Sequence, residues 1–389
     1  IKMSDSNRWL LPDGVEDLLP PLAGDLEGLR QRLLGLFERC GYEIVIPPLV
    51  EFVDSLLTGT GQDLDLKTFK FTDQTSGRLI GVRADMTPQV ARIDAHSLNR
   101  SETTRLCYTG TLLHAQAENM LASRTPIRVG AELFGDTGIS GDLEIISLMV
   151  QAAREAGLEE LRLEIGDVGV FMELLADSQI SGDQVSTLFD LIQKKAPRDL
   201  EAVVSEMALP DETTTAMVVL PSLFGGDEVI EAAVRYFGAF PTILRRLDAL
   251  SAVLRGLEQR FDDIDIYVDL SELRGLGYHT GLVFAAYAGH RSDVIARGGR
   301  YDDVGKVFGR ARGATGFDMD LRGLVEMQTR PTDTRQSVLA PVGSVPAPDD
   351  LWRTIVKLRD EGYVVIEAAG TPPPTDWTLY HDGEHWTLE

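Results

Sequence analysis

The spacing of hydrophobic positions predicts two long amphipathic helices in the first half of the chain, with strands around them. Apolar residues recur every three to four positions over residues 22–40 and 142–156, and a glycine follows each segment. Short β-branched or alternating runs predict strands. These strands are expected at residues 43–51, 69–72, 78–83, 105–114, 127–135 and 161–165. Because most of them follow one another without an intervening helix, the pattern favours an α+β fold over a β-α-β repeat.

The second half of the chain reads as a helical insertion, a return to the sheet and a small separate domain. Residues 168–260 have helical periodicity interrupted by glycines and prolines. Further strands are expected at 264–270, 282–287, 293–296 and 314–321, and the glycine-rich stretch 297–303 is expected to form a turn that enters a helix. From about residue 330 the composition shifts toward proline and threonine, which predicts a core domain at 8–328 and a small α/β domain at 329–389.

Composition narrows the possible partners. The 389 residues carry a formal net charge of −24, and 43% of them are hydrophobic. Such acidity disfavours general nucleic-acid binding and an anionic membrane surface, and it fits a cytoplasmic protein. The two cysteines are far apart, and His381 and His385 flank a hairpin turn without a third ligand, so we expect no metal site. No apolar run has the length of a membrane helix.

The stretch 272–284 carries the most suggestive chemistry. Closely spaced glycines allow close backbone approach, Arg274 offers a planar fork for a carboxylate, and Tyr278 and His279 add rings with polar tips. That combination suits a small zwitterionic ligand. The alternative is a loop with a solvated arginine.

Two other places could contribute to the same site. Thr87 is expected to be the N-cap of a helix with Pro88 as its first residue, which would place Asp85 and Thr87 where a strand hands over to a helix start. Thr87 could equally do no more than cap that helix. Glu132 lies in a strand core, where its carboxylate needs a partner, either a ligand ammonium or imidazole or a neighbouring arginine.

Six segments, in order, resemble the catalytic core of histidyl-tRNA synthetase and, more closely, its paralogue, the regulatory subunit of ATP phosphoribosyltransferase. They are L-L-P-D-G-V-E-D-L at 10–18, the strand at 41–47, V-R-A-D-M-T-P-Q-V-A-R at 82–92, the unit 110–132, L-R-G-L-G-Y-H-T-G at 273–281 and G-G-R-Y-D at 298–302. The resemblance covers roughly residues 8–325. It implies a class II synthetase-like antiparallel sheet flanked by helices, and a self-dimer formed through the strand around Pro47.

Departures from the synthetase pattern concern ATP. Where the synthetase has F-R-x-E, this chain has His114 at the arginine position and Gln116 at the glutamate position. Where the synthetase has G-L-E-R, this chain has Gly323 at the arginine position, and Asp320 places a negative charge where triphosphate would lie. Lost donors of this kind remove transition-state stabilisation. The C-terminal domain is also short and acidic, so we expect no catalysis, no cofactor and no tRNA binding.

The amino-acid side of the resemblance is better preserved. Asp85 stands at the position where the synthetase meets the ammonium group of its histidine ligand, and Thr87 is the same residue as in the synthetase. By the resemblance, Glu132 would face the histidine ligand, Arg274 would meet its carboxylate and Tyr278 would meet its imidazole. His279 replaces a second tyrosine, and Arg128 replaces a glutamine and could repel an imidazolium. The resemblance therefore implies an allosteric histidine site made by Asp85, Thr87, His114, Arg128, Glu132, Arg274, Tyr278 and His279.

The function implied by the resemblance is that of a non-catalytic regulatory subunit. It would activate the short-form catalytic subunit of ATP phosphoribosyltransferase in a hetero-octamer and mediate feedback inhibition by histidine in the first step of histidine biosynthesis. Two alternatives stay open: an active aminoacylating enzyme like histidyl-tRNA synthetase, and an adaptor without a small-molecule site.

Overall fold

A computed structural model describes residues 9–57, 62–117, 122–176, 178, 180–207, 209–289, 294–328, 335–342, 350–368 and 371–389. The chain divides into two compact units, Ile1–Arg330 and Pro331–Glu389. Among the described residues, no helix combines the length and apolarity that crossing a membrane requires.

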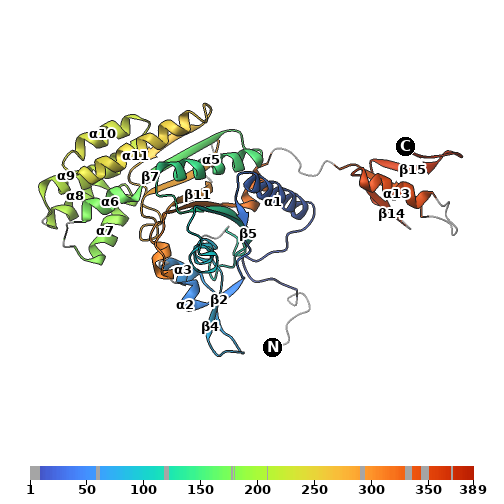
Figure 1. Cartoon of the computed structure of the whole chain (residues 1–389), viewed down its shortest axis with the longest axis horizontal. Helices are drawn as coiled ribbons and strands as arrows, with labels where there is room; N and C mark the ends of the chain where they lie inside the picture. The colour runs from blue at the N-terminus through green and yellow to red at the C-terminus, as the bar shows by residue number, and fades with distance from the viewer. Residues whose placement is uncertain are drawn as a thin grey trace. The chain divides into compact units, whose positions relative to one another are not determined.

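The larger unit is built on a nine-stranded sheet (Figure 1). The strands, in spatial order, are β1 (Glu43–Ile44), β5 (Thr104–Thr111), β6 (Ile127–Phe134), β12 (Ala314–Asp320), β11 (Val294–Arg300), β10 (Leu282–Ala288), β7 (Leu161–Asp167), β9 (Asp265–Asp269) and β8 (Phe224–Gly225). Only the pairs β1–β5 and β7–β9 are parallel. The predicted mostly antiparallel α+β fold is therefore confirmed, with the helical segment entering between β7 and β9.

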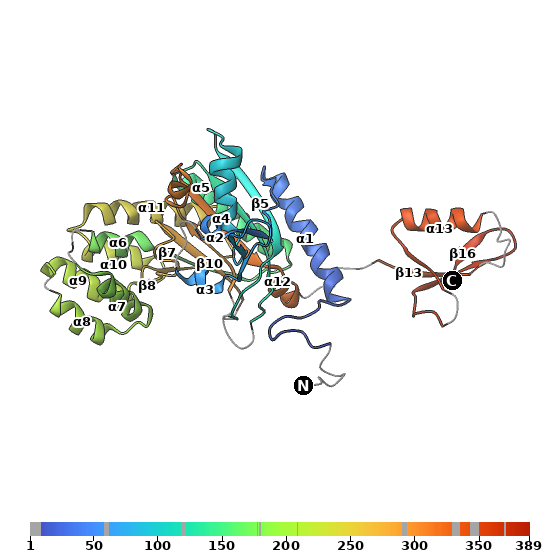
Figure 2. The ribbon, with the colours of Figure 1, turned by 90° about the horizontal axis from the view of Figure 1, so that it is seen from below.

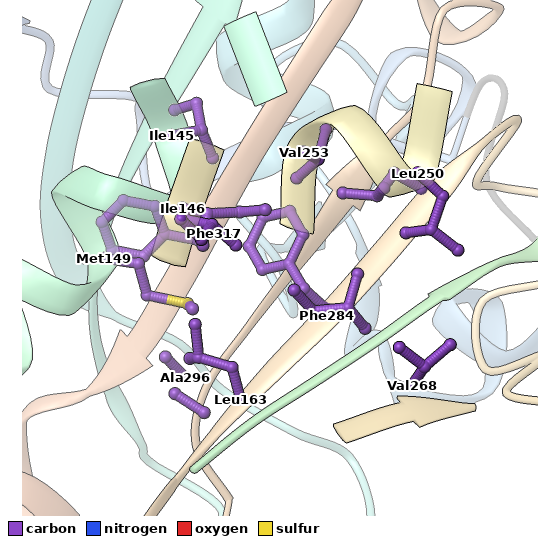
Figure 3. Packing of buried hydrophobic residues seen from close by; sticks show 14 of the residues in the cluster. Ile145, Ile146, Met149, Leu163, Leu250, Val253, Val268, Phe284, Ala296 and Phe317 are labelled. Carbon is purple, nitrogen blue, oxygen red and sulfur yellow. The ribbon is translucent and has the colours of Figure 1, made fainter. Parts of the chain in front are cut away.

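Three long helices cover one face of this sheet: α1 (Leu22–Arg39), α5 (Ile139–Glu155) and α11 (Pro241–Glu258). Figure 3 shows Met149 from α5 and Val253 from α11 meeting Phe284 and Phe317 from the strands. All four side chains are at most 4% exposed. Burial of a side chain of this size stabilises the fold by roughly 1.5–3 kcal/mol. Because side chains alternate along a strand, the neighbours of Phe317 point to the opposite face.

That opposite face meets a small second layer at its β5–β6 end. The three-stranded sheet β2 (Val50–Phe52), β4 (Leu79–Val82) and β3 (Lys70–Thr72) leads into α4 (Thr87–Arg92) and a π-helix (Ile93–Leu98). Val90 of α4 is fully buried in a cluster with Tyr108 and Phe134 of the large sheet. The helix start is thereby held against strands β5 and β6.

The remaining helices of the unit form the insertion and several short connections. The insertion helices α6 to α10 gather at the β7–β9–β8 end of the sheet (Figures 1 and 2). Their bounds are Val168–Leu175 (α6), Gly182–Gln193 (α7), Pro197–Glu206 (α8), Asp211–Val219 (α9) and Glu228–Tyr236 (α10). The short helices are α2 (Val53–Leu56), α3 (Gln62–Lys67), α12 (Leu321–Met327) and 3₁₀ helices at Leu220–Ser222 and Val304–Phe308.

The smaller unit has its own four-stranded sheet and helix. The strand order is β14 (Val364–Glu367), β13 (Ser337–Ala340), β15 (Trp377–His381) and β16 (Trp386–Leu388), and α13 (Leu351–Asp360) packs on the sheet. His381 and His385 are exposed, and the His381 ring lies 5.0 Å from that of Trp386. The predicted hairpin at residues 382–383 is confirmed.

Two predicted elements are wrong. Residues 43–51 do not form one strand but the short strands β1 and β2, because the intervening Pro47 and Pro48 have no N–H group for a ladder. Residues 297–303 do not form a turn into a helix. Instead β11 continues to Arg300, and a 3₁₀ helix begins only at Val304. The Phe284 ring fills the space beside Gly298, which explains a glycine inside the strand.

Candidate amino-acid-binding site

Charged side chains from adjacent strands share the sheet face opposite α5 and α11. The register pairs Gly130, Asp318, Arg297, Ala285 and Glu164 in one continuous row from β6 to β7. Paired residues point to the same side of a sheet. This face therefore carries carboxylates and an arginine across five strands.

Glycines keep the floor of this face open for other side chains. A Cβ atom at Gly316 would overlap Oε2 of Glu132, and one at Gly299 would lie 2.7 Å from Nδ1 of His279. Real Cβ atoms do not approach so closely, so any larger residue would push Glu132 or His279 away. The two candidate site residues lie directly on these glycines.

Glu132 is 1% exposed, and two tyrosine hydroxyls donate to its carboxylate. The Tyr108 hydroxyl bonds Oε1 at 2.9 Å, and the Tyr301 hydroxyl bonds Oε2. Burial raises the pKa of Glu132 to about 8, although these hydroxyls favour the ionised form. The sequence left open whether its partner is an arginine or a ligand. The structure assigns tyrosines to that role.

Asp85 and Thr87 join the same hydrogen-bonded chain. Oδ1 of Asp85 accepts the Thr87 amide at 3.0 Å, and Thr87 Oγ1 lies 3.2 Å from the Tyr108 hydroxyl. The prediction that Thr87 is the N-cap is wrong, since α4 begins at Thr87 and Met86 occupies the cap position. The Asp85 carboxylate satisfies the first amide, which leaves the Thr87 hydroxyl for Tyr108.

Tyr278 and His279 complete the aromatic wall of the site. The loop that carries them has positive φ at Gly275 (75°) and Gly277 (89°). The Tyr278 ring stacks on Tyr301 with centroids 5.2 Å apart and meets His279 edge-on at 5.2 Å. Burial lowers the pKa of His279 to about 4, so its imidazole is neutral at pH 7. The Tyr278 hydroxyl oxygen is buried without a hydrogen-bond partner among the described residues, a feature of a site that receives a ligand.

Arg128 is neutralised within the site. Its Nη1 lies 3.1 Å from Oδ1 of Asp318. Burial raises the pKa of Asp318, and Arg128 opposes that rise. The expectation that Arg128 repels an imidazolium therefore loses its physical ground. The sequence reading missed Asp318, although the alternation of Asp318 and Asp320 along a strand indicated two acids on one face.

His114 contacts the backbone next to Asp85. Its side chain is buried, and Nε2 lies 3.1 Å from the carbonyl oxygen of Ala84. A carbonyl accepts only from a donor, so this nitrogen carries the proton. His114 thus supports the backbone immediately before Asp85.

Arg274 lies at the other end of the face. Its Nη2 donates to Glu272 Oε2 at 2.6 Å and pairs with Glu164 Oε1 at 3.5 Å. It also lies 3.4 Å from the Tyr287 hydroxyl. The β7 strand that carries Glu164 is separated from β12 by three strand spacings, about 14 Å. Of the eight predicted residues, Asp85, Thr87, Glu132, Tyr278 and His279 form one connected cluster, with Arg128 and His114 beside it, and Arg274 stands apart with partners that sequence reasoning missed.

At the position where a synthetase would hold triphosphate, one of the chain's own carboxylates caps the helix start. Oδ1 of Asp320 accepts the amides of Arg322 (3.0 Å) and Gly323 (3.4 Å), which caps the start of α12. Arg322 itself pairs with Glu326 at 2.7 Å and with Glu16. A helix start that would otherwise attract phosphate is thus occupied by a carboxylate. Among the described residues, no group of three or more histidine, cysteine, aspartate or glutamate side chains could hold a metal ion.

Known proteins are similar to this chain in sequence. The family model described as histidyl-tRNA synthetase matches residues 14–324. The ATP phosphoribosyltransferase regulatory subunit of Thioalkalivibrio sulfidiphilus is 47% identical over 395 residues, and the match covers 99% of each chain.

Solved structures are similar as well. The crystal structure of an "ATP phosphoribosyltransferase regulatory subunit/histidyl-tRNA synthetase" from Bacillus halodurans is 26% identical, with a TM-score of 0.79, covering 94% of this chain and 93% of that chain. A chain of the ATP phosphoribosyl transferase (HisG:HisZ) complex from Thermotoga maritima has a TM-score of 0.57 at 19% identity, covering 76% of this chain and 97% of that chain, which shows a shared fold alone.

Proposed function

The chain belongs to the family of ATP phosphoribosyltransferase regulatory subunits, relatives of histidyl-tRNA synthetase, and from this membership we propose that it regulates a separate catalytic subunit in histidine biosynthesis and catalyses no reaction itself. The observation that carries the proposal is the contrast between the two ends of the site. The amino-acid end has a buried carboxylate on two tyrosines, whereas the phosphate end is capped by Asp320.

The absence of catalysis is tested by ATP–pyrophosphate exchange in the presence of histidine. We expect no exchange above the rate without protein, because the carboxylate of Asp320 repels phosphate where an arginine is needed. Exchange at a rate typical of a synthetase would overturn the proposal and restore the aminoacylating alternative.

L-Histidine is the ligand that best fits the amino-acid end. Asp85 supplies a carboxylate for its ammonium group. The buried Tyr278 hydroxyl and the Glu132 carboxyl supply polar partners for an imidazole, and Arg274 supplies a fork for the carboxylate. Binding of histidine to one conformation of the complex would shift the population toward the inhibited state.

Isothermal titration of histidine into the chain, alone and with the catalytic subunit, tests this sensor role. Heat is expected in at least one of the two states. Its absence from both would favour the adaptor alternative.

Assembly would proceed through a self-dimer of the core and a hetero-octamer with the catalytic subunit. Support for the dimer comes from apolar side chains on both sides of Pro47, where Ile46 is 87% exposed and Leu49 is 53% exposed. Exposed apolar residues that cluster in one segment are typical of a contact surface. Light scattering after size-exclusion chromatography of the chain alone should give twice the mass of 42.7 kDa. A monomer at micromolar concentration would refute the self-dimer.

A further inference from the structure

The arginine that would meet the ligand carboxylate is already held by two carboxylates of the chain. Glu272 accepts hydrogen bonds from both the backbone and the side chain of Arg274. Its Oε1 accepts from the Arg274 amide at 2.7 Å, and its Oε2 accepts from Nη2 at 2.6 Å. Glu164 approaches the same Nη2 at 3.5 Å. The side chains of Glu272 and Glu164 are 13% and 16% exposed, so water screens these contacts only in part.

We propose that Glu272 is an internal competitor for the ligand carboxylate, so that an amino acid gains Arg274 only by displacing Glu272. This inference rests on the proposed histidine-sensing function. It assigns to Glu272 the role of setting the affinity, a role that the sequence resemblance does not give to this residue.

The donor geometry of arginine makes the competition direct. A guanidinium grips a carboxylate with two parallel N–H groups, using Nη2 together with either Nη1 or Nε. In the structure, the two N–H groups of Nη2 donate to Glu272 and to the Tyr287 hydroxyl, and the Glu164 carboxylate lies 3.5 Å away as an ion pair. An incoming carboxylate therefore has no free N–H on this nitrogen. Bidentate binding requires at least one of the chain's acceptors to leave.

The charges around Arg274 also support competition between Glu272 and a ligand carboxylate. Burial works to raise the pKa of Glu272, yet the Arg274 guanidinium and amide outweigh it and hold that pKa below its usual range. Burial raises the pKa of Glu164. Two carboxylates already surround one guanidinium, and a third would add repulsion without adding a donor. Glu272 has the shortest contact and stays ionised, so of these groups it competes most strongly with a ligand carboxylate for Arg274.

The consequence is a sensor with weakened affinity for free amino acid. Exchange of one carboxylate for another at Arg274 brings little net electrostatic gain, so the ammonium and imidazole contacts must supply the binding free energy. Such a site responds only when its ligand is abundant. Neutralising the competitor should therefore make the site more sensitive.

Titration calorimetry with Glu272→Gln tests the inference. The glutamine keeps an oxygen for the Arg274 amide and removes the charge that holds the guanidinium. We expect histidine to bind about tenfold more tightly, since a hydrogen bond to a charged group is worth on the order of 1.5 kcal/mol. Histamine, an imidazole amine without a carboxylate, should bind both proteins equally. The matched control is Glu159→Gln, an exposed carboxylate before β7, which should change neither ligand's affinity.

The outcomes separate this inference from the function on which it rests. Wild-type binding with unchanged or weaker histidine affinity in E272Q overturns the competitor role and leaves histidine sensing in place. Equal tightening for histidine and histamine also overturns it, because the carboxylate is then irrelevant. No heat with either ligand in any protein, both alone and with the catalytic subunit, overturns the sensing function itself. If E272Q does not fold by circular dichroism, Glu164→Gln carries the same test. There, tightening of about threefold supports the inference, and none overturns it.

Discussion

Replacing Glu132 with glutamine should remove a pH-dependent loss of stability from the core. The carboxyl is 1% exposed and lies between two tyrosine hydroxyls, and burial raises its pKa from the usual 4.5 to about 8. Between these values the folded chain keeps a proton that the unfolded chain releases. The contribution of Glu132 to the free energy of unfolding is therefore most favourable below pH 4.5 and falls as the pH rises toward 8.

The size of this effect follows from the pKa difference. One pKa unit corresponds to about 1.4 kcal/mol, so the wild type should lose roughly 3 kcal/mol between pH 4.5 and pH 7 through this group, and roughly 5 kcal/mol once the pH exceeds 8. Glutamine has the same shape and does not titrate. The stability difference between E132Q and wild type should shift in favour of E132Q by these amounts as the pH rises.

Urea denaturation followed by far-ultraviolet circular dichroism is the suitable assay. Trp352, Trp377 and Trp386 belong to the smaller unit, so tryptophan fluorescence would mainly report its unfolding, whereas most helices belong to the larger unit. Glu159→Gln, which removes an exposed carboxylate, is the control for the loss of one negative charge. A constant difference between E132Q and wild type from pH 5 to pH 8 would refute the reasoning, because it would mean that the buried carboxyl titrates normally.

Three further predictions concern the glycines under Glu132, the proposed self-dimer and the role of Arg274. Gly316→Ala should destabilise the core by about 1–3 kcal/mol because its Cβ overlaps the Glu132 carboxylate, whereas Gly323→Ala, with its nearest atoms 3.8 Å away, should be neutral or stabilise by up to about 1 kcal/mol; urea denaturation compares them. Ile46→Asp should convert the proposed dimer to monomers in sedimentation velocity, and an unchanged sedimentation coefficient would contradict that. Arg274→Ala should abolish inhibition by histidine in a catalytic assay of the complex while leaving activation intact, because the unpaired Glu272 and Glu164 carboxylates would then repel the ligand carboxylate. Equal loss of inhibition and activation would contradict their separation.

The fold could be predicted where the signal is local. The helix expected at 22–40 occurs as Leu22–Arg39, because a full amphipathic face with a following glycine specifies its own limits. The glycines at 298 and 299 misled the prediction for a non-local reason. These two positions of the strand hold glycine because the Phe284 and His279 side chains, which come from other segments, occupy the space that a side chain there would need.

In the candidate site, too, some features could be predicted from the sequence and others depend on contacts between distant segments. The resemblance supplied the positions of Asp85, Glu132 and Tyr278, and their role in binding histidine stays a prediction. Tyr108 and Tyr301, which hold Glu132, could not be found from spacing, since only the strand pairing brings them together. Glu272 was within reach of a sequence argument, because it lies two residues before Arg274. The resemblance, however, assigns that arginine to a ligand and therefore hides its internal partner.

Gly316 in strand β12 and Glu272 in the loop before β10 differ in how readily each can be substituted during evolution. Gly316 and Glu132 interlock, so a larger residue at position 316 is tolerated only together with a smaller one at position 132. Glu272 belongs to a loop that also contains the exposed Arg274, and a neutral residue there leaves the strands untouched. Under the proposed histidine-sensing function, a single-codon change at Glu272 would shift the histidine concentration at which the pathway is inhibited, while the strands of the site stay unchanged.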